Sequence, residues 1–133
     1  PNTSFIIGSP NESKKEILET LNFIKFYKLT HFNVYTITPF PGTPVWEYAK
    51  SRNLVSEHMN WDYLALNFTE NYKHAIILSE KLSRKQLYKL YLLFRKQKYR
   101  VLITNTLNKP LTIPLILFKA LKRIILGVPL IDR

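Results

Sequence analysis

The chain of 133 residues contains no cysteine, so it can form no disulfide and can offer no thiolate to a metal ion or an iron–sulfur cluster. Only three glycines occur and 46% of the residues are hydrophobic, which argues against a flexible linker or a disordered segment. No stretch reaches about 18 consecutive apolar residues, so no membrane-spanning helix is predicted. These absences favour one folded domain in a reducing compartment. The predicted location is the cytoplasm, with membrane association as an alternative.

Acidic residues are almost missing from the second part of the chain. Residues 1–80 carry seven basic and eight acidic groups, whereas residues 81–133 carry thirteen basic groups and one acidic group, Asp132. The net charge of +11 therefore resides in the C-terminal part. A segment this basic indicates either an anionic partner or a solvated helix face.

Common catalytic and metal-binding patterns are missing as well. The histidines His31, His58 and His74 do not have the paired spacing of a zinc site. No P-loop, G-x-S-x-G or G-x-G-x-x-G motif is present, and the carboxylates form no obvious acid–base pair. The residues alone therefore predict no catalytic residue and no metal ligand in this chain.

The first 38 residues have the pattern of a strand, a helix and a second strand. Thr3–Gly8 is short and apolar, as a buried parallel strand should be. Ser13 and Glu16 have the spacing of a capping box, which predicts a helix from there to about Tyr27. The β-branched segment His31–Thr38 follows as the second strand. Such a unit predicts parallel strands joined by a right-handed crossover, so both strands end at the same edge.

The loop after the second predicted strand is stiffened by proline. Thr36–Pro44 contains three prolines, and each residue before a proline is driven toward extended geometry. Thr43 can then cap a helix that begins at Pro44 and ends near Arg52. This arrangement is typical of the ligand-facing edge of an α/β fold, although a connector without a ligand is the simpler interpretation of the loop alone.

The C-terminal part is predicted to be helical. Ser83 can cap a long helix that runs to about Thr104, and a last helix is predicted from about Ile113 to Leu126. The stretch Ala75–Leu78 before them is either a short strand or a packed extended segment. Apolar residues occupy one side of the long helix. The basic residues expected on its opposite side are Arg84, Lys85, Lys89, Arg95, Lys96 and Arg100.

Two of these segments resemble a known family. Phe5–Ser13 (FIIGSPNES) resembles the "IIGxPxET" segment of the radical S-adenosylmethionine (radical SAM) superfamily, and Thr36–Pro44 (TITPFPGTP) resembles its "xxTPFPGTP" segment, in the same order and at the same spacing. Trp61–Tyr63 and the basic segment that begins near Leu82 are similar to the cobalamin-binding branch. The resemblance spans roughly residues 3–104.

The resemblance implies an α/β fold, namely the C-terminal fragment of a partial TIM-type (β/α)₆ barrel. The chain would contain the last two parallel strands and then a mainly helical tail. Residues 1–52 would form the last βαβα part of the barrel, residues 53–80 a connecting segment with a Trp-Asp-Tyr anchor, and residues 81–133 a basic helical extension.

The resemblance also implies a binding site for S-adenosylmethionine. Ile6 would contact the adenine, Gly8 would allow close approach, and Glu12 would brace the loop. The backbone that follows the second strand would lie near the adenine edge. The positions implied to bind the cofactor are Ile6, Gly8, Glu12, Thr38, Pro39 and Phe40, and no catalytic or metal-binding residue is implied.

The superfamily needs a [4Fe–4S] cluster held by three cysteines in a C-x-x-x-C-x-x-C loop, and this branch also uses cobalamin. The chain has no cysteine and lacks the first four strands of the barrel. It is therefore expected to be inert alone and to bind none of these cofactors by itself. Its expected partner is the missing N-terminal half of the barrel, with which it would form a cobalamin-type enzyme, such as a methyltransferase.

A basic helical binding module is the alternative function. Residues 81–126 would then lie on an anionic membrane surface. Nucleic acid is the less favoured partner, because Tyr91 and Phe94 fall on the apolar side of the predicted helix and not among its basic residues.

Overall fold

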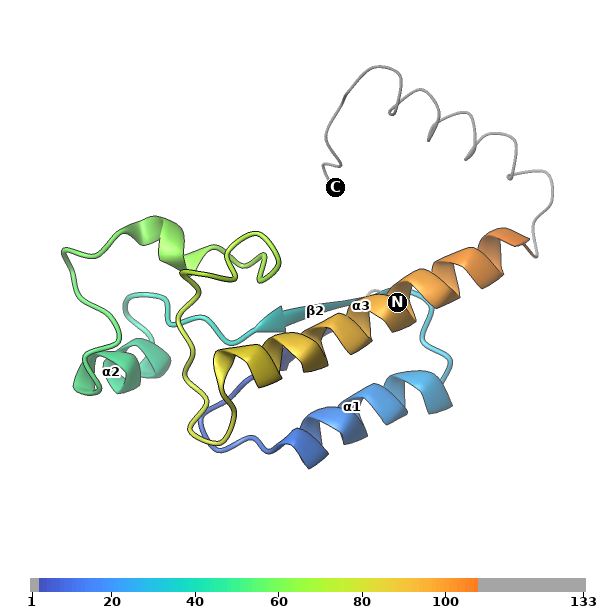
Figure 1. Ribbon diagram of the computed structural model, residues 1–133, viewed down its shortest axis with the longest axis horizontal. Coiled ribbons are helices and arrows are strands. Elements are labelled where there is room, and N and C mark those ends of the chain that lie inside the picture. The colour runs from blue at the N-terminus through green and yellow to red at the C-terminus, as the bar shows by residue number, and fades with distance from the viewer. Residues whose placement is uncertain (1–2, 108–133) are drawn as a thin grey trace, which may run out of the picture. The chain divides into compact units, whose positions relative to one another are not determined.

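The computed structural model describes residues 3–107 (Figure 1). They form a two-stranded parallel sheet and several helices, joined by irregular segments. The elements in chain order are β1 (Thr3–Ile7), α1 (Lys14–Phe26), β2 (Phe32–Thr36), α2 (Pro44–Ser51), the short 3₁₀ helix η1 (Trp61–Leu64) and α3 (Arg84–Leu107). Residues up to Lys98 form one compact unit, and the packing described below is that of this unit.

The predicted strand–helix–strand unit is confirmed. β1 and β2 pair in parallel, with Thr3 opposite Phe32 and Ile7 opposite Thr36. The pairing extends one residue further, because the N–H of Ile37 donates to the carbonyl of Ile7 over 2.9 Å. β2 is shorter than predicted, since Thr38 precedes a proline that has no N–H to donate to a ladder.

The start of α1 is the predicted capping box. The side chain of Ser13 accepts from the N–H of Glu16 over 3.3 Å, and the Glu16 carboxylate accepts from the N–H of Ser13 over 2.7 Å. α1 buries Ile17, Leu21 and Ile24, as its apolar stripe requires. The local sequence therefore fixes both where this helix begins and which side faces the core.

The capping box predicts a dependence of α1 on pH. Hydrogen bonds from the side chain and backbone of Ser13 hold the pKa of Glu16 below its ordinary value. Because this pKa is lower in the folded chain, the stabilisation is present above the ordinary pKa of glutamate and is lost as pH falls through the lowered value. We expect Ser13→Ala to move the Glu16 pKa back up, as measured by NMR titration of the carboxyl carbon. An unchanged pKa would contradict this assignment.

One face of the sheet carries the main core. Ile7 and Phe32 are buried together with residues of α1 and with Leu87, Leu90 and Phe94 of α3. Figure 1 shows α1 and α3 running side by side and opposite in direction to β2. A second buried cluster joins α2 to the segments that follow it, and its members are Trp46, Ala49, Val55, Leu64 and Leu78.

The other face of the sheet is open. The side chain of Ile6, which points away from the face that buries Ile7, is 62% exposed, and Ser4 is exposed as well. Within residues 3–107, the prediction of a buried parallel strand therefore holds for Ile7 and is wrong for Ser4 and Ile6. Burial depends on what packs against a strand, and the described residues cover only one side of it.

α3 begins at the predicted position and ends later than predicted. Ser83 caps it, with Gln86 accepting from the N–H of Ser83 over 2.8 Å, and the helix continues to Leu107. The predicted segment Ala75–Leu78 forms no strand but a packed stretch in which Ala75 and Leu78 are buried. The last predicted helix lies outside the described residues.

Two arginines of α3 are not part of a solvated basic face, which corrects the prediction for them. Arg84 donates to the carbonyls of Tyr72 and Ala75 over 2.8 and 2.6 Å. Arg95 donates to the hydroxyl of Thr69 over 2.5 Å. Both therefore hold the irregular segment between η1 and α3 against the helix.

None of the helices between residues 3 and 107 has the length and hydropathy that crossing a bilayer requires.

Candidate functional site

The candidate site lies where β1 and β2 end. Since the strands are parallel and in register, the turn after Ile7 and the loop after Ile37 lie side by side at one edge of the sheet. This is the edge at which α/β folds bind ligands, because the loops there diverge from the strand ends and leave backbone groups accessible. The predicted proximity of the two loops is therefore confirmed.

Glu12 braces the turn after β1, as expected. Its carboxylate accepts from the N–H of Gly8 over 2.5 Å and from the N–H of Ser9 over 3.2 Å. The N–H of Glu12 in turn donates to the carbonyl of Ser9 over 3.0 Å. Gly8 has a φ of +87°, a conformation that glycine adopts without a steric penalty. One carboxylate thus fixes a left-handed turn at the strand tip.

The loop after β2 provides backbone groups and one exposed ring. Thr38 is half-buried and its hydroxyl donates to the carbonyl of Thr36 over 3.3 Å. Pro39 is fully buried, whereas Phe40 is 43% exposed. The hydroxyl of Thr43 donates to the carbonyl of Phe40 over 2.6 Å and so closes the loop onto the start of α2. Backbone atoms and the Phe40 ring are therefore among the groups that this loop offers to a ligand.

A shallow depression adjoins the first strand tip. It is lined by the turn after β1, the first turn of α1 and one side chain of α2, with Ser9, Pro10, Asn11, Glu12, Glu16 and Tyr48 as its lining residues. Ile6 does not line this depression but lies on the open face of the sheet that ends beside it. Of the six predicted positions, Glu12 lines this depression, and the other five belong to the ends of the two strands and the loop after β2. Their role toward a cofactor stays a prediction.

A polar cluster that no sequence pattern predicted adjoins this depression through Tyr48. The Tyr48 hydroxyl donates to the Glu80 carboxylate over 2.6 Å, and Arg52 pairs with the same carboxylate while its guanidinium lies 4.5 Å from the centre of the Tyr48 ring. The N–H of Glu80 also donates to the carbonyl of Pro10 over 2.9 Å. Glu80 thus ties α2 to the turn after β1, and no local spacing could indicate this because Tyr48 and Glu80 are 32 residues apart.

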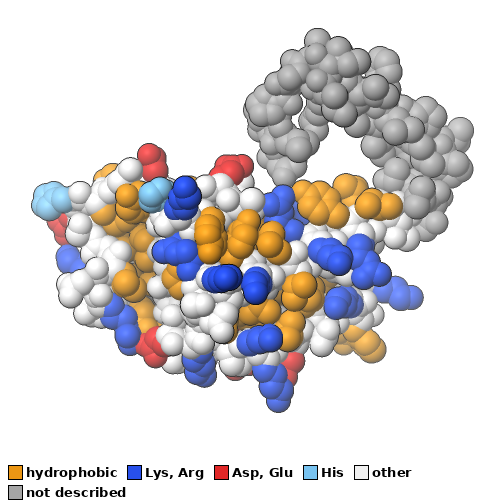
Figure 2. Space-filling model, in the orientation of Figure 1, with side chains coloured by type: hydrophobic (Ala, Val, Ile, Leu, Met, Phe, Trp, Pro, Cys, Tyr) orange, Lys and Arg blue, Asp and Glu red, His pale blue; other side chains and the backbone are white. Residues whose placement is uncertain are grey.

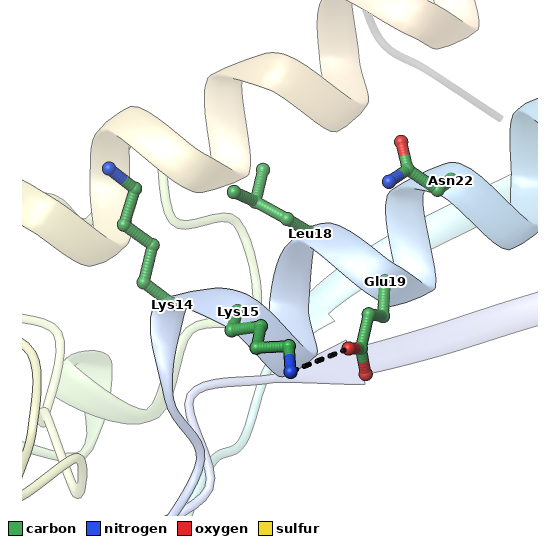
Figure 3. A pocket seen from close by; sticks show the side chains of 5 residues that line it. All are labelled: Lys14, Lys15, Leu18, Glu19 and Asn22. Carbon is green, nitrogen blue, oxygen red and sulfur yellow. Dashed lines mark ion pairs between the residues drawn. The ribbon is translucent and has the colours of Figure 1, made fainter.

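A second depression lies on α1, and we assign it no role. Figure 3 shows Lys14, Leu18 and Asn22 along one side of the helix, and Lys15 paired with Glu19 beside them. That ion pair spans 3.9 Å between side chains that are 86% and 61% exposed, a setting in which ion pairs contribute little. The place is an open helix surface without converging polar groups.

Residues 3–107 contain no group of three or more histidine, cysteine, aspartate or glutamate side chains that could hold a metal ion. The Nδ1 atom of His31 lies 2.9 Å from the Thr30 hydroxyl, and the ring of His74 stacks on Tyr63 with centroids 4.9 Å apart. The side chains of His31 and His74 are therefore in contact with neighbouring residues of this chain.

Parts of two kinds of group-transferring enzyme are similar in sequence to this chain. An uncharacterized methyltransferase of Pyrococcus horikoshii is 39% identical over 92 residues, which are 68% of this chain and 19% of that protein. The ribosomal protein uS12 methylthiotransferase RimO of two Synechococcus strains is 36% identical over 44 residues, or 33% of this chain. The chain is thus related to part of enzymes named for the transfer of methyl or methylthio groups.

The relatives are much longer than this chain. It spans about a fifth of the Pyrococcus methyltransferase, and its match to the methylthiotransferases covers 9% and 10% of their length. No protein family model matches the chain, and no solved structure matches it.

Proposed function

We propose that this chain is the C-terminal part of a radical SAM methyltransferase and that its two strand tips form one wall of the S-adenosylmethionine pocket. The observation that carries the proposal is the turn at Gly8 and Ser9, held by Glu12 beside the end of β2. The relationship to a methyltransferase and to methylthiotransferases supports the same class of reaction.

Each residue of the wall would have a separate task. The exposed side chain of Ile6 offers an apolar surface for a purine ring. Gly8 would form the left-handed turn at the strand tip, because the position of its missing Cβ faces Leu87 in the core. Glu12 would keep the turn rigid, so that less ordering is required when the ligand binds. Thr38 would add backbone groups to the wall of the pocket, and Phe40 would add part of its exposed ring.

The residues of this chain do not fit the iron–sulfur cluster of the superfamily. Its ligands are three cysteine thiolates, and the chain has no cysteine. No step of the reaction is therefore assigned to this chain. Its residues would position S-adenosylmethionine, and chain segments outside this sequence would supply the cluster and, in the cobalamin branch, the cobalamin.

The remaining barrel would pack along the free edge of β1. Among residues 3–107, β1 pairs only with β2, so its other edge has backbone groups without a strand partner. Next to it, Phe5 contacts Phe23 with ring centroids 6.4 Å apart, and Phe23 and Tyr27 are 49% and 59% exposed. An unpaired edge beside exposed aromatic rings favours a partner that adds a strand and covers these rings.

A chimera tests the proposed pocket. In the Pyrococcus methyltransferase, the matched segment is replaced by its counterpart from this chain, and binding of S-adenosylmethionine is measured by calorimetry. We expect the chimera to bind and Glu12→Ala to weaken binding roughly tenfold, because a hydrogen bond to a charged group contributes about 1.5 kcal/mol.

The control is Glu57→Ala, which removes a carboxylate that is 71% exposed and paired with Lys50 over 3.1 Å. This variant should bind as the chimera does. Equal binding by the Glu12→Ala chimera, with unchanged helix content, would refute the role of the braced turn.

A further inference from the structure

We infer that the solvent-facing side of α3 between Arg84 and Lys98 binds an anionic lipid surface. This inference does not depend on the proposed methyltransferase function. The surface, here called the lysine face, consists of three exposed lysines and the two exposed leucines that flank them: Lys85, Lys89, Leu92, Leu93 and Lys96.

The lysine face follows from the spacing of residues on the helix. Lys85, Lys89 and Lys96 are four and seven residues apart, about one and two turns, so they line up on one side of the helix. The opposite side buries Leu87, Leu90, Tyr91 and Phe94. Packing of the core therefore fixes which way the lysines face.

The charge of this face is not neutralised within residues 3–107. α3 contains no acidic residue, and no ion pair or hydrogen bond involves the three lysine side chains in the described part of the chain. Arg84 and Lys98 are excluded from the face, because Arg84 binds backbone carbonyls and Lys98 donates to Asn33 over 2.8 Å. Figure 2 shows Lys and Arg side chains among hydrophobic ones over α3, with the acidic side chains of this view nearer its margins.

The leucines favour a lipid surface over a nucleic acid. Leu92 and Leu93 are 39% and 42% exposed on either side of the lysines, and aliphatic side chains at that place can enter the boundary between headgroups and acyl chains. A nucleic acid is better matched by exposed aromatic rings that stack on bases. The aromatic residues of this stretch are directed inward, since Tyr91 and Phe94 are buried and the Tyr88 ring lies 5.3 Å from that of Phe68.

Vesicle binding by the full 133-residue chain tests the inference. We propose flotation with phosphatidylcholine vesicles containing about 30% phosphatidylserine, at low salt, for the original chain and for Lys85→Gln/Lys89→Gln/Lys96→Gln. Each lysine near an anionic surface strengthens binding about fivefold, so the triple variant should bind roughly 100-fold more weakly. Binding of the original chain should also weaken as salt is raised.

The matched control is Lys15→Gln/Lys25→Gln/Lys73→Gln, which removes the same charge from exposed positions outside α3. It should lose far less affinity than the α3 variant, with far-UV circular dichroism showing equal helix content in all three proteins. Equal vesicle binding by the two triple variants overturns the inference. Tighter binding to a single-stranded oligonucleotide than to the vesicles, lost only in the α3 variant, overturns the choice of lipid.

Discussion

Replacing Phe68 with alanine is expected to lower the free energy of unfolding by about 4 kcal/mol, the range of large-to-small changes at fully buried aromatic residues. Phe68 has no exposed surface, and its ring centroid lies 6.1, 5.3 and 5.5 Å from those of Tyr72, Tyr88 and Tyr91. The substitution would remove the ring around which this aromatic cluster packs. It would also loosen the irregular segment that α3 holds in place.

Urea denaturation of the full chain, followed by tryptophan fluorescence and circular dichroism, measures this effect. Phe68→Leu keeps most of the volume and should destabilise the fold by less than half as much. Phe26→Ala is the control, because its side chain is 79% exposed and its removal should change stability by no more than about 0.5 kcal/mol. A Phe68→Ala variant as stable as Phe26→Ala would show that the cluster adds little to the fold.

The elements that the sequence predicted well are those whose ends are determined by neighbouring residues. The capping box at Ser13 and the threonine–proline start of α2 each involve hydrogen bonds within four residues. Asn53 follows α2 at a φ of +57°, a left-handed conformation that asparagine tolerates. Such signals can be read without knowledge of the rest of the fold. The proximity of the two strand tips could also be predicted, because the strands of a βαβ unit are parallel and end at the same edge.

The features that could not be predicted depend on contacts between distant segments. Phe68 lies in a turn without hydrophobic periodicity, so nothing near it in the sequence distinguishes it from an exposed loop residue. Arg84 was assigned to the solvent because helical spacing ignores the carbonyls of Tyr72 and Ala75 that it binds. The exposure of Ile6 has a related cause, since a strand pattern cannot tell whether one or both faces are covered.

The candidate site also combines features that could be predicted from local sequence with features that depend on distant segments. Glu12 bonds to groups three and four residues before it, so its bracing of Gly8 and Ser9 could be expected from a short motif. The contact of Glu80 with Pro10, Tyr48 and Arg52 joins three separate segments and has no sequence signal. Local motifs therefore located the strand tip, and the tertiary structure was needed to see what supports it.

Gly8→Ala is expected to lower the free energy of unfolding by about 3 kcal/mol, through two separate effects. The first is the φ of +87°, which costs a residue with a side chain about 1–2 kcal/mol. The second is steric, because a Cβ atom at this position would lie 2.8 Å from Cδ2 and 3.3 Å from Cδ1 of Leu87. Since Leu87 is buried in the core, its side chain has little room to move, and overpacking adds about 1 kcal/mol or more.

A double-mutant cycle with Leu87→Ala separates the two effects. Leu87→Ala leaves space next to Gly8, so Gly8→Ala should cost about 1 kcal/mol less in that background, while the backbone cost remains. Gly42→Ala is the control, because Gly42 has a φ of +80° but no atom within 4 Å of an added Cβ. It should show the backbone cost alone. If Gly8→Ala destabilises the chain no more than Gly42→Ala does, then the side chain of Leu87 does not restrict the space at Gly8. The wall proposed for S-adenosylmethionine would in that case depend for its rigidity on Glu12 and on the hydrogen bond from Glu80 to Pro10.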